Sequence, residues 1–460
     1  MKKHQLILTT TALFTFLFYN EDMGTNVFFF ALALLFFTVK QTNQKTKLFK
    51  WFIGTTILSA MSFAWYGDIA SFFALAFSLI FLQFQSIDPQ LKLIQSIGVV
   101  AINMVTSVGR PFITSQWVPK TKIDNDGIKK IIAYILIPSI FIVLFFVAYS
   151  FGSDTFSSLF QYELDVNVWQ ITLIAALGFY ITFSYWNYFT PNYCQGLNNK
   201  LANDFSAETH EQHKPTFSFL DKNFERKSGE ISLILLNFML VIFIGTYNYE
   251  QFFKATDVAN LSADTHDRVN AVIISIIMAV AVILFYFKGA FNFDKNAKVL
   301  KVLAKIWISL NAILIISSAI KNSEYILQFG MTYKRLGVYA FLGLAFIGLI
   351  MTLIKIQHKK TNAFLFNQMF LYVYGLLLVC AIFNWGNLIT TYNISVNKGV
   401  DPYFICHLNF NDEARRIYFK ENKLNAKYSE ENKESNISRN QNTSFLSKNL
   451  YYSSIDKLKQ

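Results

Sequence analysis

The chain has 460 residues, of which 53% are hydrophobic and only 15% are charged. Soluble domains contain about 25% charged residues, so the composition excludes an ordinary soluble protein and indicates an integral membrane protein. The net charge of +12 does not require a nucleic-acid partner, because the cytoplasmic loops of membrane proteins collect Lys and Arg.

Twelve apolar stretches are candidates for membrane-spanning helices, which need roughly 20 mostly apolar residues. In chain order they cover residues 5–20, 24–39, 50–66, 69–86, 91–108, 130–150, 168–187, 230–248, 269–288, 300–320, 337–356 and 363–384. The first follows a basic start, as in a signal peptide, but it lacks a small-residue cleavage site, so we interpret it as an uncleaved helix. The sequence thus predicts an all-α fold, a polytopic integral membrane helix bundle.

The positions of the basic residues discriminate among these stretches, because cytoplasmic loops carry an excess of Lys and Arg. Basic and base-poor connections alternate along almost the whole chain if the stretch 91–108 does not cross the membrane. That stretch also contains Lys92 and Asn103, which are costly in hydrocarbon. We therefore predict about 11 transmembrane helices plus one interfacial or re-entrant helix on the inner side. The alternative, with twelve spans, would place the basic loop 110–130 outside.

The same rule orients the chain in the cell inner (cytoplasmic) membrane, with the basic N-terminus in the cytoplasm and the C-terminal tail outside. Residues 1–394 are expected to form the transmembrane domain, which includes a polar cytoplasmic loop at 188–229. Residues 395–460 form a polar tail, in which FNDEARRIYFKENK has the charge pattern of a helix. After about residue 421 the low hydrophobicity predicts partial disorder.

The sequence contains no Walker loop and no signature of the common hydrolases. His210 and His213 lie three residues apart in the cytoplasmic loop, but a zinc site needs three or four ligands with defined spacing. We interpret them as part of a solvated loop and predict no metal site. Cys194, Cys380 and Cys406 are scattered, so we expect no disulfide framework. The sequence does not identify a cofactor.

Three motif-like clusters lie on the outer side in this threading and together form the candidate ligand site. They are DTHDRVN with His266, Asp267 and Arg268, TYKR with Tyr333, Lys334 and Arg335, and NWGN…YN with Tyr392 and Asn393. Arginine binds anions through paired hydrogen bonds and histidine titrates near neutral pH, so the set suits an anionic headgroup or a small anionic solute. The alternative is three unrelated helix ends, since aromatic belts and snorkelling bases give the same residue types.

The motifs T-Y-K-R-x-G-V-Y and N-W-x-x-x-I-x-x-Y-N-I, together with THDRVN and KGAFNF, occur between roughly residues 230 and 394. Over this part the chain resembles an uncharacterised bacterial multi-pass membrane family, known as a domain of unknown function. The resemblance implies a polytopic inner-membrane protein and supplies no activity, cofactor or protein partner.

We expect a multi-pass membrane protein that handles a lipid or small anionic solute at the outer membrane face, with the lipid bilayer as its partner and no nucleic acid. Two alternatives stay open: a non-catalytic partner or assembly factor, and a membrane enzyme acting on a lipid-linked substrate. The enzyme hypothesis predicts that His266, Asp267, Lys334 and Arg335 converge in one pocket. The assembly hypothesis predicts dispersed polar residues and a groove or tail that docks another protein.

Overall fold

The computed structural model describes residues 1–43, 45–118, 167–206, 221–253, 261–424 and 427–455, with a few positions between 133 and 149. Every regular element in these ranges is a helix, which confirms the all-α fold class. Most of the predicted span 130–150 and the two histidines of the cytoplasmic loop lie outside the described residues.

A helix forms at each of the other eleven apolar stretches. These helices are α1 (Lys3–Phe18), α2 (Thr25–Gln41), α3 (Lys47–Tyr66), α4 (Ile69–Ile87), α5 (Gln95–Thr106), α9 (Val168–Trp186), α12 (Lys222–Phe252), α13 (Leu261–Tyr286), α14 (Lys298–Phe329), α15 (Tyr333–Gln357) and α16 (Asn362–Ile382). Six of them, α4, α9, α12, α14, α15 and α16, are long and apolar enough to cross a membrane. The structure therefore supports a helical membrane protein, while the count of 11 spans stays a prediction.

Helix α5, in the doubtful stretch 91–108, has 12 residues. At about 1.5 Å per residue it is roughly 18 Å long, which is shorter than the hydrocarbon core of about 30 Å.

Polar residues in the connections fix where several helices begin. A side-chain oxygen accepts a hydrogen bond from the backbone N–H three residues later at Thr46, Asp68, Asn167, Thr332, Thr361 and Asn384. Such caps satisfy N–H groups that have no partner inside the helix.

The chain divides into two compact units, residues 1–22 with 99–189 and residues 23–98 with 190–460. In the first unit α1 packs along α9. Gly178 permits this close approach, because a Cβ atom there would lie 2.5 Å from the ring of Phe14. The hydroxyls of Thr11 and Thr182, 2.7 Å apart, add a hydrogen bond between the two helices.

A buried arginine fastens the end of α5 within this unit. The Nη1 atom of Arg110 donates to the carbonyl of Asn187 at 2.6 Å, and Nη2 donates to Asn103 Oδ1 at 3.1 Å and to Ser107 Oγ at 2.8 Å. The amide of Asn103 in turn donates to the carbonyl of Phe189 at 2.8 Å. The turn after α5 is thereby attached to the segment that follows α9.

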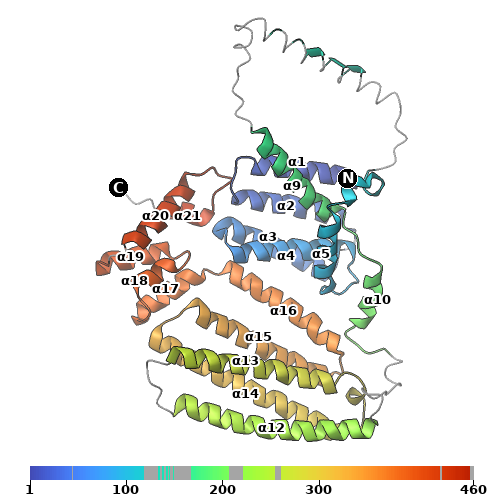
Figure 1. The fold of residues 1–460 in the computed structure, drawn as a ribbon, viewed down its shortest axis with the longest axis vertical. Coiled ribbons are helices and arrows are strands. Elements are labelled where there is room, and N and C mark those ends of the chain that lie inside the picture. The colour runs from blue at the N-terminus through green and yellow to red at the C-terminus, as the bar shows by residue number, and fades with distance from the viewer. Residues whose placement is uncertain are drawn as a thin grey trace. The chain divides into compact units, whose positions relative to one another are not determined.

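In the second unit α3 packs against α2, α4 and α16, and α14 packs against α12, α13 and α15 (Figure 1). Helices α15 and α16 also pack together, which joins the two groups into one bundle. The hydroxyl of Tyr374 in α16 lies 2.7 Å from Ser78 Oγ of α4 and donates to Thr55 Oγ1 of α3 at 2.9 Å. A short helix, α10 (Tyr193–Lys200), also belongs to this unit.

After α16 the described residues form five helices, α17 (Trp385–Val396), which leads into the tail, and then α18 (Pro402–His407), α19 (Asp412–Asn422), α20 (Lys427–Asn442) and α21 (Leu450–Ser454). Helix α19 confirms the helix predicted in FNDEARRIYFKENK. Beyond residue 421, where low hydrophobicity predicts partial disorder, the described residues include α20 and α21.

Contacts with the rest of the unit explain why this polar segment folds. Tyr451 and Ile437 are buried, and α21 packs against α3. The backbone N–H of Thr25 donates to the carbonyl of Lys448 at 3.1 Å, at the start of α2. The tail also has a small apolar cluster of its own, in which Ile405, Cys406 and Phe419 are buried.

Candidate functional site

Two of the three motif clusters meet in the structure. Asn393, which is fully buried near the end of α17, accepts a hydrogen bond from the backbone N–H of Met331 at 2.6 Å and donates to the carbonyl of Met331 at 3.0 Å. It also donates to the carbonyl of Gly399 at 3.3 Å. The turn between α14 and α15, which immediately precedes TYKR at the start of α15, is therefore joined to the segment NWGNLITTYNI.

Arg335 makes its contacts within this turn. Its guanidinium group donates to the carbonyl of Gly330 and lies over the ring of Tyr325, 4.1 Å from the ring centre. A cation held against an aromatic face and hydrogen-bonded to backbone is positioned by the fold. This residue accordingly stabilises the end of α14.

Tyr333 lies where the tail meets the bundle. Its hydroxyl accepts a hydrogen bond from the backbone N–H of Asn409 at 3.3 Å. Gly386 permits this contact, because a Cβ atom there would lie 1.7 Å from the Asn409 carbonyl oxygen and 2.9 Å from the Tyr333 hydroxyl. Lys334 is exposed, and Tyr392 is half-buried.

The third cluster falls on the first turns of α13. The backbone of His266, Asp267 and Arg268 is helical, but their side chains lie outside the described residues. The structure thus joins the start of α15 to α17 and the tail through Asn393 and Tyr333, and it does not test whether DTHDRVN lies beside them.

Sequence reasoning missed a polar cluster between α12 and the loop from α13 to α14. Asp294, buried in that loop, forms ion pairs with Lys222 at 3.3 Å and with Arg226 at 3.8 Å. Burial raises the pKa of the Asp294 carboxyl, but the backbone N–H of Asn296 and the two bases outweigh this effect and leave the pKa below its ordinary value. The KGAFNF motif immediately precedes Asp294, so this motif could have indicated the cluster from the sequence.

Two lysine side chains donate hydrogen bonds to backbone carbonyl groups of the same loop. The Nζ atom of Lys355, fully buried at the end of α15, donates to the carbonyl of Phe287 at 2.7 Å. The Nζ atom of Lys301 donates to the carbonyl of Asn292 at 3.0 Å. The two lysines therefore connect the end of α15 and the start of α14 to the loop that follows α13.

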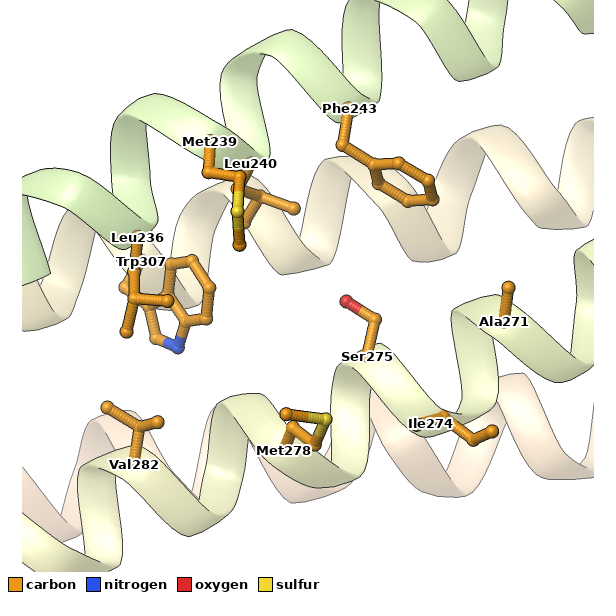
Figure 2. A pocket seen from close by; sticks show the side chains of 10 residues that line it. All are labelled: Leu236, Met239, Leu240, Phe243, Ala271, Ile274, Ser275, Met278, Val282 and Trp307. Carbon is orange, nitrogen blue, oxygen red and sulfur yellow. The ribbon is translucent and has the colours of Figure 1, made fainter.

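An apolar cleft opens between α12 and α13, in front of α14 (Figure 2). Its volume is about 520 Å³, within the range of roughly 300–1,000 Å³ that is usual for ligand sites. Side chains from both helices point into it, and they are Leu236, Met239, Leu240 and Phe243 from α12 and Ala271, Ile274, Ser275, Met278 and Val282 from α13.

Trp307 of α14 forms the floor of this cleft. Its indole N–H donates to the carbonyl of Ala279 at 3.2 Å, so the ring presents apolar surface to the cleft. Ser275 contributes a hydroxyl to the lining. The sequence could not predict the cleft, because the apolar residues that line it are the same types that face lipid elsewhere on a membrane helix.

The six long apolar helices define the class of the protein, an α-helical integral membrane protein. The chain belongs to the family described as a domain of unknown function, DUF4153, whose model matches residues 6–416. The match extends well beyond the range 230–394 over which the motifs showed the resemblance, so the N-terminal helices also belong to the family domain. No curated protein and no solved structure matches the chain.

Proposed function

We propose that this protein binds a lipid, with an acyl chain in the cleft between α12 and α13 and the headgroup at the outer end of α13. The observation that supports the proposal most directly is the apolar cleft in the middle of the apolar stretches of both helices. In a bilayer such a cleft is surrounded by acyl chains, which match its chemistry.

The dimensions of the cleft suit one acyl chain. The lining stretch of α13, from Ala271 to Val282, is about 16 Å long at roughly 1.5 Å per residue. One leaflet contributes about half of the hydrocarbon core of about 30 Å. A chain that enters from one leaflet therefore fits along the cleft.

The headgroup end follows from the helical register. Arg268 precedes Ala271 by three residues, and residues three apart lie on the same face of a helix. It therefore occupies the face of α13 that continues the cleft, with His266 and Asp267 on the same turn. An arginine at this place suits a phosphate-bearing headgroup, to which it can donate two parallel hydrogen bonds.

The outer location of this end depends on the threading, for which we propose eleven spans in the bacterial inner membrane, with the N-terminus inside. Two contacts support the placement of 91–108 on one side. Gln95 at the start of α5 donates to Asn198 Oδ1 at 3.3 Å, and Arg110 after α5 donates to the carbonyl of Asn187. Both ends of the stretch are therefore bonded to the connection that follows α9.

Photo-crosslinking tests the lipid proposal. The full-length protein is reconstituted into liposomes that contain a phospholipid with a diazirine in one acyl chain, and cross-linked peptides are identified by mass spectrometry. We expect cross-links to concentrate at Met239 and Met278. Met278→Trp should fill the cleft and reduce this labelling several-fold, because an indole occupies the space of the chain.

Ile277→Trp is the matched control, since Ile277 is the neighbouring exposed residue and does not line the cleft. It should leave the labelling unchanged. Equal labelling in the two tryptophan variants, or cross-links spread evenly around the bundle, would contradict the proposal. Arg268→Gln should lower cross-linking by an anionic lipid more than by a zwitterionic one if the headgroup assignment is right.

Cysteine accessibility tests the threading separately. With Lys122→Cys and Thr155→Cys in turn, a membrane-impermeant thiol reagent added from the periplasmic side should label the cysteine at 155 and not the one at 122. The opposite pattern would reverse the assignment of sides.

A further inference from the structure

A second, polar pocket lies at the ends of α2, α4 and α10, away from the apolar cleft and independent of the lipid proposal. Its volume is about 870 Å³, large enough for a ligand of several rings by the usual range of roughly 300–1,000 Å³. Seven of its lining residues carry side-chain amides, and they are Gln41, Asn43, Gln90, Asn192, Gln195, Asn198 and Asn199.

Two side-chain contacts give the pocket a fixed frame. The hydroxyl of Thr190 donates to the carboxylate of Asp88, which joins the segment before α10 to the end of α4. Asn198 accepts from the backbone N–H of Lys92 at 3.0 Å and donates to the carbonyl of Gln90 at 3.4 Å. Thr190 and Asn198 therefore connect the walls of the pocket to one another.

Other amides are left available for a ligand. Asn192, Gln195 and Asn199 recur at spacings of three and four, so they share one face of α10. Asn192 occupies the N-cap position of that helix, yet its side chain makes no capping hydrogen bond. Within the described part of the chain, the side chains of these three residues have no hydrogen-bond partner.

The charge of the pocket selects among ligands. Its described lining contains one carboxylate, Asp88, and no lysine, arginine or histidine. A phosphate or carboxylate ligand would therefore meet a like charge with no compensating cation. Among the described residues no group of His, Cys, Asp or Glu is arranged to hold a metal ion, and no aromatic ring of the lining is available to stack on a nucleobase.

We propose that this pocket binds a neutral, hydroxyl-rich ligand, that is, a saccharide. Each sugar hydroxyl both donates and accepts hydrogen bonds, and each amide offers two N–H donors and one acceptor oxygen, so the two sets of groups match. Ile87, Pro89, Leu91 and Pro191 supply apolar surface for the C–H faces of a sugar ring. The saccharide is either free or the headgroup of a glycolipid.

Saccharide binding is measured on the full-length protein in nanodiscs. The protein is extracted with an amine-oxide detergent, because a maltoside detergent would itself present a saccharide to the pocket. One arm titrates D-glucose, D-galactose and N-acetyl-D-glucosamine and follows saturation-transfer NMR signals. The other arm compares nanodiscs with and without a monoglucosyl diacylglycerol by native mass spectrometry.

We expect a signal in at least one arm, and the arm that responds identifies the source of the saccharide. The variant Gln195→Ala/Asn199→Ala should weaken that binding at least tenfold. Both positions are exposed, so the fold should be retained, which an unchanged melting temperature checks. Gln357→Ala, which changes an exposed amide outside the pocket, should bind as the unmodified protein does.

Three results would overturn the proposal. They are the absence of binding in both arms, equal binding by the double variant and the unmodified protein, and preferential binding of glycerol 3-phosphate or of a neutral tripeptide amide used as competing probes.

Discussion

The side-chain amide of Asn393 binds both backbone groups of Met331, accepting from the N–H at 2.6 Å and donating to the carbonyl at 3.0 Å. One side chain thus supplies hydrogen-bond partners for the N–H and the carbonyl of Met331, which have no partner in a regular helix. Gly330 and Gly399 flank the contact with positive φ angles of 84° and 62°. Asn393 therefore fixes the position of TYKR relative to the tail.

Replacing Asn393 with Ala should destabilise the protein markedly. The two hydrogen bonds to the half-buried Met331 backbone would be lost, and a hydrogen bond contributes about 0.5–1.5 kcal/mol net. We expect a lower melting temperature for the detergent-purified variant in differential scanning fluorimetry. Tyr392→Phe is the control, because the Tyr392 hydroxyl has no hydrogen bond within the described residues, and it should melt like the unmodified protein. Equal melting temperatures for the two variants would show that the contact contributes nothing.

Gly386→Ala should displace the tail from the bundle. The added methyl group would lie 1.7 Å from the Asn409 carbonyl oxygen, a backbone atom, so the chain itself must shift. We expect faster cleavage between α17 and α19 in limited proteolysis. Gly375→Ala in α16 meets no atom within 4 Å and should stabilise its helix slightly, by about 0.5–1 kcal/mol. Identical proteolysis of Gly386→Ala and the unmodified protein would argue against this packing.

Arg415→Met should unfold the tail helices. Arg415 is fully buried and donates to Asp412 Oδ1 at 3.2 Å and to Glu434 Oε1 at 2.9 Å, so its removal takes the positive charge away from the buried Asp412 carboxylate. Breaking a buried ion pair from one side costs about 3–5 kcal/mol. We expect rapid proteolysis after α17, while the exposed substitution Lys420→Met leaves the rate unchanged. A tail that stays resistant in Arg415→Met would refute the ion cluster as its main support.

Acid should loosen the same region. Burial raises the pKa of Glu434, but hydrogen bonds from Arg416 and Arg415 outweigh this effect and hold the pKa below its ordinary value. The stabilisation is therefore complete above the pKa of the unfolded chain, about 4.3, and is lost as the pH falls through the lowered value. Proteolysis with an acid-active protease should accelerate below about pH 4. Glu434→Gln should show a smaller acceleration, and an equal one would exclude Glu434 as the titrating group.

The sequence predicted the helices well, because each contains an apolar run, and several begin at a polar capping residue such as Thr332 or Asp68. It did not predict the fold of the tail, since burial of Tyr451 depends on surfaces contributed by distant helices. For the candidate site, the motifs predicted neither the hydrogen bond between Tyr333 and Asn409 nor the bonds that Asn393 makes with Met331. The α12–α13 cleft arises from how two helices diverge, which residue types do not encode.

Arg110→Lys should release the turn after α5 even though the charge is kept. The planar guanidinium reaches the Asn187 carbonyl through Nη1 and both Asn103 and Ser107 through Nη2, while an ammonium is a single point of donation. Each hydrogen bond to a charged group contributes about 1.5–3 kcal/mol, so the loss of one or two should lower the melting temperature by several degrees. Arg439→Lys, at an exposed position of α20, controls for the chemical change and should have no effect. Equal melting temperatures for Arg110→Lys and Arg439→Lys would show that the Arg110 hydrogen bonds do not stabilise the turn after α5. The structural support for a non-crossing 91–108 stretch would then be lost.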